Sequence, residues 1–139
     1  MSPEASANTT DTGKVFDLER VICRMSELEV HGARGFTIGE GDFPLRGFVV
    51  RVGDSVRGYV NRCPHAGHPL DLLPQRFLTP DGALIVCSSH GALFEKATGQ
   101  CLAGPCVGRS LTAVPLEVRS GFVLLAEGVD ANALGAVAP

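Results

Sequence analysis

The chain has 139 residues, of which 45% are hydrophobic, a size that fits one domain with a buried core but not two large ones. Its formal net charge is -3, with 12 basic and 15 acidic residues, so it lacks the basic field that attracts nucleic acids or anionic lipids. Its longest apolar runs have the length of single strands, and its first residues contain no apolar signal region. We therefore expect a cytoplasmic protein whose partners include neither nucleic acid nor a membrane.

Short β-rich runs, separated by glycine, proline and aspartate, dominate the chain and predict an all-β domain. The predicted strands lie at residues 20–24, 35–38, 46–52, 55–61, 83–87, 112–118 and 122–126. Residues 1–14, rich in Ser, Thr, Ala and Asn, are predicted to form a disordered tail. Residues 128–139, small and weakly apolar, are predicted to form a flexible tail. The folded domain is expected to span residues 15–127.

Two turns and two short helices complete the predicted secondary structure. The sequences VGDS at 52–55 and RSG at 119–121 are typical of hairpin turns between neighbouring strands. One helical candidate is MSELEVHG, in which Ser26 would cap the first turn and Glu29 would be the next carboxylate. The other candidate is the carboxyl tail.

Two cysteine and histidine pairs carry the chemistry of the sequence. Cys63-x-His65 is followed, after 21 residues, by Cys87-x-x-His90, and each pair comes after a β-rich run. Two such loops, each with a glycine within two residues after the histidine, could face each other across one site. Two thiolates and two imidazoles suit either a tetrahedral zinc ion or an iron–sulfur cluster. Zinc fingers normally group cysteines with cysteines and histidines with histidines, whereas each loop here supplies one of each.

This paired arrangement resembles the Rieske [2Fe-2S] family, whose motif is Cys-x-His in one loop and Cys-x-x-His in the next. The resemblance extends from about Val49 to Ala126 and includes CPHAGHPLD, CSSHGALF and TGQCLAGP. It implies an antiparallel β sandwich or barrel with a small inserted cluster-binding lobe at about residues 61–108. It also implies the ligands: Cys63 and Cys87 would bind one iron of a [2Fe-2S] cluster, and His65 and His90 the other. The spacer is longer than is common, and we interpret residues 74–82 as an insertion.

Four further positions imply a low reduction potential. High-potential members of the family place a serine and a tyrosine, whose hydroxyls bond the cluster sulfurs, where this chain has Ala92 and Phe94. They also clamp the two loops with a disulfide, at the positions of His68 and Ser89 in this chain. The resemblance therefore implies a low-potential, ferredoxin-type centre without the clamping disulfide.

The remaining cysteines and histidines are given structural roles. We expect His31 on the surface, His68 as a loop histidine outside the cluster, and Cys23 in the core of a strand. Cys101 and Cys106 flank LAGP, whose Gly-Pro pair resembles the loop that shields Rieske clusters from water. Because a disulfide is disfavoured in the cytosol, we expect the two to be thiols that pack near this loop.

The predicted function is one-electron transfer rather than catalysis. Only His31 and His68 are spare, and too little chain remains for the mononuclear iron domain of a terminal oxygenase. The protein would be the ferredoxin component of an oxygenase or reductase system, or the small Rieske subunit of a larger redox complex. Its partners would be redox proteins. The alternative from another class is a zinc-stabilised binding module without redox activity.

Overall fold

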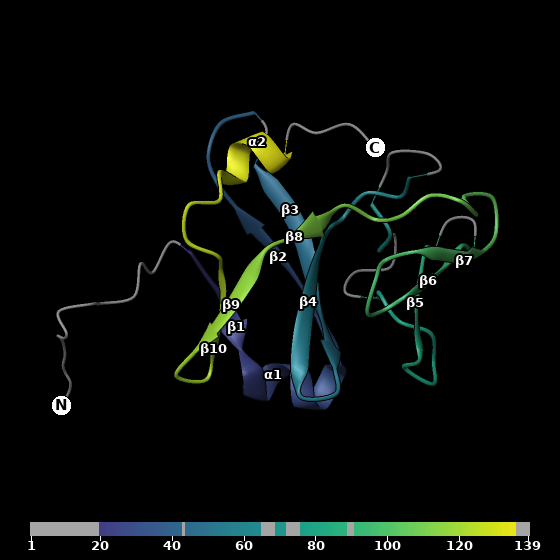
Figure 1. Ribbon diagram of the computed structural model, residues 1–139, viewed down its shortest axis with the longest axis horizontal. Helices are drawn as coiled ribbons and strands as arrows, with labels where there is room; N and C mark the ends of the chain where they lie inside the picture. The colour runs from purple at the N-terminus through teal and green to yellow at the C-terminus, as the bar shows by residue number, and fades with distance from the viewer. Residues whose placement is uncertain (1–19, 43, 65–68, 72–75, 89–90, 136–139) are drawn as a thin grey trace, which may run out of the picture.

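Three antiparallel sheets form the protein (Figure 1), whose computed structural model describes residues 20–42, 44–64, 69–71, 76–88 and 91–135. The first sheet, in spatial order, consists of β1 (Val21–Arg24), β10 (Phe122–Leu125) and β9 (Leu116–Arg119). The second consists of β2 (Ala33–Ile38), β3 (Leu45–Val52), β4 (Ser55–Val60) and β8 (Ala113–Val114). The third consists of β5 (Leu84–Val86), β6 (Leu93–Glu95) and β7 (Cys101–Ala103). Two short helices, α1 (Met25–His31) and α2 (Ala131–Gly135), accompany them.

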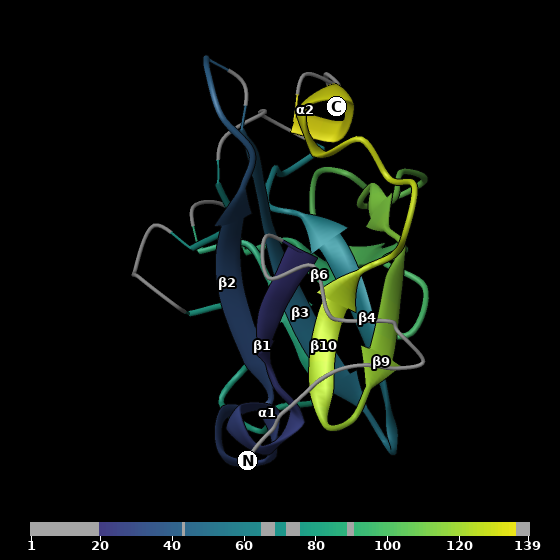
Figure 2. The same ribbon diagram turned by 90° about the vertical axis from the view of Figure 1, so that its left-hand side faces the viewer.

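The second sheet is the middle layer of the molecule. Figure 2 shows the first sheet lying in front of it, and Figure 1 shows β5, β6 and β7 beyond it at the other end. Strand β3 explains this arrangement, because its apolar run is buried on both faces. Val49 packs with Cys23 and Val123 of the first sheet, whereas Phe48 and Val50 belong to the core that includes Ile85 of the third sheet. The alternation of side chains along one strand thus joins the two halves of the protein.

The third sheet lies within an insertion between β4 and β8, and we call residues 61–112 the lobe and the first two sheets the base. Strands β4 and β8 pair directly, through Gly58 with Val114 and Tyr59 with Ala113, although more than fifty positions separate them in the chain. This confirms the predicted all-β fold with an inserted lobe closed by its flanking strands. An aromatic stack links the base to the lobe: the ring centroids of Phe48 in β3 and Phe77 in the lobe lie 4.6 Å apart, and the rings are nearly parallel.

Both predicted hairpin turns are confirmed, each with the backbone that a tight turn needs. Ser120 and Gly121, between β9 and β10, both have positive φ, of 53° and 83°. Two successive residues in this region form the turn type that matches the twist of paired strands. Between β3 and β4, Gly53 has φ 61° and Val52 pairs with Ser55.

One predicted strand and one predicted helix cap were wrong in detail. The predicted strand 112–118 is split into β8 and β9 at Pro115, which has no N–H to donate to a ladder. Helix α1 lies where predicted, but its N-cap is Arg24 rather than Ser26. The carboxylate that stabilises the first turn is that of Glu27, which accepts the Arg24 backbone N–H at 2.9 Å, and not that of Glu29.

Strands β6 and β7 were not predicted, and the ends of the chain were predicted only in part. Helix α2 confirms the helical candidate in the carboxyl region, within the range expected to be a flexible tail, and its Leu134 packs against the core. The predicted tail at 1–14 lies outside the described residues, as do residues 136–139. Within the part of the chain that the structure describes, no helix is both long and apolar enough to span a bilayer.

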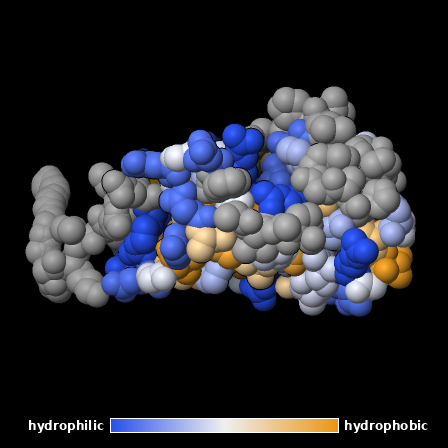
Figure 3. Space-filling view, turned by 90° about the horizontal axis from the view of Figure 1, so that it is seen from above, coloured by the Kyte–Doolittle hydropathy of each residue, from blue (hydrophilic) through white to orange (hydrophobic). Residues whose placement is uncertain are grey.

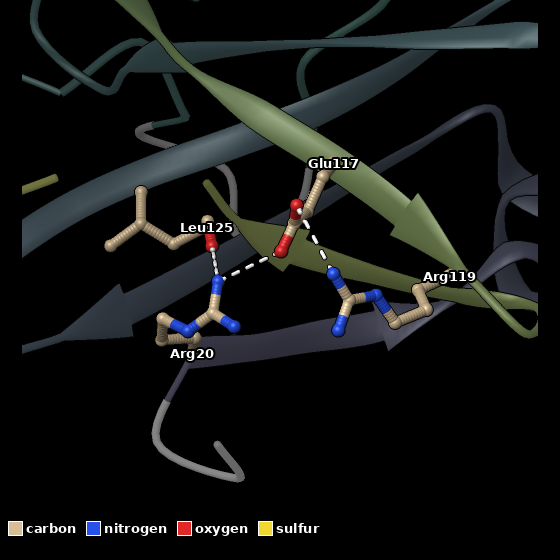
Figure 4. A network of polar contacts seen from close by, with 4 residues as sticks. All are labelled: Arg20, Glu117, Arg119 and Leu125. Atoms are coloured by element: carbon tan, nitrogen blue, oxygen red, sulfur yellow. Dashed lines mark hydrogen bonds and ion pairs between the residues drawn. The ribbon is translucent and has the colours of Figure 1, made fainter. Parts of the chain in front are cut away.

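A small polar network fastens the start of β1 to the opposite edge of its sheet (Figure 4). The Arg20 guanidinium donates to the Glu117 carboxylate at 2.9 Å and to the Leu125 carbonyl oxygen at 2.7 Å. The other Glu117 oxygen lies 3.8 Å from the Arg119 guanidinium. Because these side chains are partly exposed, each ion pair contributes at most about 1 kcal/mol.

Candidate metal centre

Cys63 and Cys87, the two predicted thiolate ligands, lie in the same buried core. Each follows a strand, Cys63 after β4 and Cys87 directly after β5. Neither has any solvent-exposed surface, and both belong to the cluster of side chains between the second sheet and the lobe. The structure therefore places the first residues of both predicted ligand loops in the same layer of the protein. The predicted partners His65 and His90 lie outside the described residues, as do His68 and Ser89.

Asn61 closes the base of the first loop. Its side-chain oxygen accepts the backbone N–H of Leu70 at 2.8 Å, and its side-chain nitrogen donates to the Asp71 carboxylate at 2.7 Å. The side-chain amide of Asn61 thus joins the two ends of the first loop, which carries the Cys63-x-His65 motif. Asn61 was not among the predicted site residues, although its position directly after an apolar strand was a usable signal.

The second loop folds back on Cys87. The Cys87 backbone N–H donates to the Ala92 carbonyl oxygen at 2.9 Å, and its carbonyl oxygen accepts the Gly91 N–H at 2.8 Å. The neighbouring Ser88 donates its N–H to the Leu70 carbonyl oxygen at 2.9 Å, which connects the second loop to the first. The backbone of the cysteine is therefore fixed on both sides, and its thiol has a defined position.

A third segment, residues 101–109, lies against both loops, and we call it the covering segment. Arg109 donates to the Pro64 carbonyl oxygen at 2.9 Å and so reaches the first loop. Gly104 approaches the second loop so closely that a Cβ on it would lie 2.8 Å from the Ala92 Cα. This segment contains the predicted shielding loop and holds it in place through Arg109, a residue that the sequence analysis missed because its partner lies 45 positions away.

Two buried side chains in the same cluster as Cys87 have no hydroxyl to donate to a sulfur. Ala92 and Phe94 are completely buried in the same cluster as Cys87, and neither carries an O–H group. None of the five cysteines forms a disulfide. The Cys106 thiol has its pKa raised to about 12, first by burial and then by its hydrogen bond to Cys101 and the proximity of Cys63.

The described part of the site fits an iron–sulfur cluster in its donor chemistry. Buried thiols are soft ligands that suit iron–sulfur centres, and the described residues include no buried charged side chain. Those residues contain no group of three or more metal-ligating side chains, which is expected when two of four predicted ligands lie outside them. His31 is exposed and Cys23 is buried in β1, as predicted.

Comparison with known proteins places this arrangement in a family. Residues 9–120 match the family described as the Rieske [2Fe-2S] domain. The ferredoxin of carbazole 1,9a-dioxygenase from Nocardioides aromaticivorans IC177 is 29% identical, with a TM-score of 0.59 over 76% of this chain and 94% of that one. The ferredoxin of Sphingomonas yanoikuyae B1 is 23% identical, with a TM-score of 0.57 over 77% of this chain and 96% of that one.

The same fold also occurs within longer chains. The terminal oxygenase of carbazole 1,9a-dioxygenase from Novosphingobium sp. KA1 is 20% identical, with a TM-score of 0.60 over 82% of this chain and 31% of the oxygenase chain. No curated protein sequence matches. The family match covers most of the chain and agrees with the antiparallel sheets, the inserted lobe and the two buried cysteines: the protein belongs to the Rieske [2Fe-2S] family, whose members bind a [2Fe-2S] cluster and transfer electrons.

Proposed function

We propose that the protein is the ferredoxin component of an oxygenase or reductase system and works in the cytoplasm as a non-catalytic one-electron carrier. The observation that carries this is the burial of Cys63 and Cys87 in one core, in a chain that spans nearly the whole of an oxygenase ferredoxin. The thiolates of Cys63 and Cys87 would hold one iron, and the imidazoles of His65 and His90 the other. We expect a low potential, because Ala92 and Phe94 offer no hydroxyl to the sulfurs.

The bound cluster would supply the redox chemistry by accepting and returning one electron. The protein's contribution would be a rigid, dry setting. Asn61 holds the two ends of the first loop, and Ser88 ties the second loop to the first. Arg109 holds the covering segment against Pro64. Residues that orient ligands and exclude water tune a metal centre as much as the ligands themselves do.

The partner proteins would approach the lobe. Leu102 and Val107, in the covering segment, are 49% and 63% exposed despite being apolar. Figure 3 shows hydrophobic atoms at the right-hand end of the molecule, the end where the lobe lies in Figure 1. Protein interfaces that form transiently have apolar centres depleted of charge. The complex of reduced oxygenase and oxidized ferredoxin in carbazole 1,9a-dioxygenase contains a ferredoxin 29% identical to this chain, which supports an oxygenase as partner.

The experiment begins with the purified holoprotein. Iron and acid-labile sulfide should each approach about two per chain, and the reduced form should give an electron paramagnetic resonance signal with an average g near about 1.9. His65→Ala should remove this signal, whereas the matched variant His68→Ala should keep it. Stoichiometric zinc without sulfide would identify a binding module instead and overturn the proposal.

Electron delivery is tested separately. The protein, reduced by one electron and freed of reductant, is mixed with an oxidised Rieske oxygenase, and the visible spectra of both centres are followed. We expect reoxidation of this protein to match reduction of the oxygenase electron for electron. A cluster that is reducible but passes no electron to any oxygenase or reductase tested would refute the ferredoxin role while leaving the ligand assignment intact.

A further inference from the structure

Cys101 and Cys106 form a pair of buried thiols that electron transfer does not require. Their sulfur atoms lie 3.1 Å apart, with the Cys106 thiol donating to the Cys101 sulfur. The Cys101 thiol in turn lies 3.3 Å from the Ala103 carbonyl oxygen. Both residues are almost completely buried, at 3% and 2% exposure. Two sulfurs at this separation need to approach by only about 1 Å to reach the length of a disulfide bond, about 2.05 Å.

The pair lies within the covering segment, Cys101 at its start and Cys106 beyond its exposed LAGP stretch. Between the two cysteines stand four exposed residues, Leu102, Ala103, Gly104 and Pro105, so the pair flanks a surface stretch of the chain. The backbone of the pair is anchored through Arg109: Cys101 donates its N–H to the Arg109 carbonyl oxygen, and Arg109 donates its N–H to the Cys106 carbonyl oxygen, both at 2.9 Å. A bond between the two sulfurs would close this segment into a small ring against the two cysteine loops.

We propose that Cys101 and Cys106 form a reversible thiol and disulfide pair that hydrogen peroxide oxidises. The disulfide holds the covering segment in place over the cluster. The Cys101 sulfur, which accepts the hydrogen bond of Cys106, attacks the peroxide, its proton passes to the departing oxygen, and a sulfenic acid and one water form. The second sulfur attacks the sulfenic sulfur, the S–S bond forms, and a second water leaves. Two thiols and one peroxide thus give one disulfide and two waters. A dithiol reductant reverses the step by exchange, returning both S–H groups.

Peroxide fits the site for reasons of size and geometry. The reactant has two heavy atoms, and the sulfurs lie beneath one exposed segment rather than in the centre of the base. Cys63 is the competing partner for Cys106, because the two thiols lie within hydrogen-bonding reach of each other. In the holoprotein the proposed binding of iron by Cys63 removes this competitor. The disulfide is therefore expected while the cluster is intact, and it protects the segment next to the cluster under oxidising conditions.

Digestion with trypsin allows the Cys101–Cys106 disulfide to be measured directly. Trypsin cleaves after Lys96 and Arg109, so residues 97–109 form one peptide that contains Cys101 and Cys106 and no other cysteine. Cys63 falls in the peptide 63–76, and Cys87 falls in the peptide 77–96. Holoprotein is treated with a few equivalents of hydrogen peroxide, denatured, alkylated and digested. Peptide 97–109 should lose two hydrogens and resist alkylation, and dithiothreitol applied before denaturation should restore both alkylation sites.

Variants assign the effect to the pair. Cys106→Ser and Cys101→Ser should each leave one alkylatable thiol in peptide 97–109 and abolish the two-hydrogen loss. Cys23→Ser, which removes a buried thiol from the other core, should leave the response unchanged. With the pair oxidised, the visible absorbance of the cluster should decay several-fold more slowly in the presence of an iron chelator. Because the first readout is a peptide mass, it does not depend on electron transfer to a partner.

Three outcomes would overturn the proposal. One is a cross-link between peptides 63–76 and 97–109, which would show that Cys106 pairs with Cys63 after cluster loss. Another is the formation of sulfinic or sulfonic acid at Cys101 or Cys106 without a disulfide. The third is loss of the cluster spectrum before any change in peptide 97–109, which would show that the pair does not react first.

Discussion

The base and the lobe of this protein are held together in different ways. In the base, β3 pairs with β2 and with β4 along six residues each, and large aliphatic and aromatic side chains fill the space between sheets. In the lobe, β5, β6 and β7 are three residues long, and the loops are held by single bonds such as those of Asn61 and Arg109. Short strands with few ladder bonds are marginal by themselves. We therefore expect the base to keep its fold without the proposed metal centre, whereas the lobe should depend on that centre.

The largest expected effect comes from removing a proposed ligand. Cys87→Ser should reduce bound iron and sulfide from about two per chain to nearly none, because an alcohol is a poor ligand for an iron–sulfur cluster. Hydrogen exchange should then be fast at Ile85 and Phe94 in the lobe, while Val49 and Tyr59 in the base remain protected. Exchange measured by mass spectrometry checks the prediction.

The matched control for this variant is Cys23→Ser, which changes a buried cysteine of the base in the same way. It should keep the full amount of cluster and lower the free energy of unfolding by about 1 to 3 kcal/mol, because it buries a hydroxyl among apolar side chains. Equal loss of protection in both halves of Cys87→Ser would contradict the distinction between base and lobe.

The second prediction concerns the link between the halves. Phe77→Ala removes the ring that stacks on Phe48 at 4.6 Å, in a fully buried position. We expect a loss of about 3 to 5 kcal/mol in the free energy of unfolding. Because the lost contact joins the parts, cluster absorbance should disappear at a lower denaturant concentration than the far-ultraviolet circular dichroism of the sheets. Val118→Ala, at an exposed position of β9, should change neither midpoint beyond the range of surface substitutions, about 0.5 kcal/mol.

The base was largely predictable from sequence for the same reason that it is stable. Apolar runs rich in valine, such as the one that forms β3, are long enough to show the pattern of a buried strand. Glycine in VGDS and RSG marks the turns, since the backbone there adopts positive φ. Pro115 was a clear signal in the base that was not used, and it divides a predicted strand.

The lobe was predictable only through its motifs. Cys63 and Cys87 were identified from spacing, and the structure buries both. Strands β6 and β7 were missed because three residues are too few to show a period. Arg109 acts through Pro64, a partner 45 positions away in the chain, so its role arises only after folding. Pattern reasoning finds ligands and long strands, but it does not find the single bonds that hold loops together.

The third prediction tests the close contact between the covering segment and the second loop. Gly104→Ala places a Cβ 2.8 Å from the Ala92 Cα, at a residue whose φ is 100°. Gly108→Ala is the matched control, since its φ is 95° and a Cβ there would meet nothing within 4 Å. Both variants share the cost of a left-handed backbone, and only the first adds a steric clash.

We expect the clash to cost about 1 to 3 kcal/mol more in Gly104→Ala than in Gly108→Ala. The difference should appear as faster release of iron to a chelator, while the thermal unfolding of the base changes little. Iron release followed by absorbance for both variants provides the measurement. Equal rates would show that the segment does not press on the Ala92 loop in the loaded protein.

The smallest expected effect concerns the tuning of the centre rather than its stability. Phe94 is buried in the core cluster that includes Cys87, so a hydroxyl on its ring would lie in the layer of the proposed ligands. Phe94→Tyr should then donate a hydrogen bond to a sulfur, and such a bond is stronger when the centre is reduced and more negative. The potential should therefore rise.

The size of this rise follows from the energy of one hydrogen bond. A bond to a charged acceptor is worth about 1.5 to 3 kcal/mol, but only the part that strengthens on reduction moves the potential. For a one-electron couple, 59 mV corresponds to about 1.4 kcal/mol, so we expect some tens of millivolts. Ala92→Ser should add a similar increment, roughly additively if its hydroxyl contacts a different sulfur. Voltammetry on both single variants and the double variant decides the matter: an unchanged midpoint with an intact spectrum would mean that neither side chain faces the cluster. The lobe would then set the potential by burial alone.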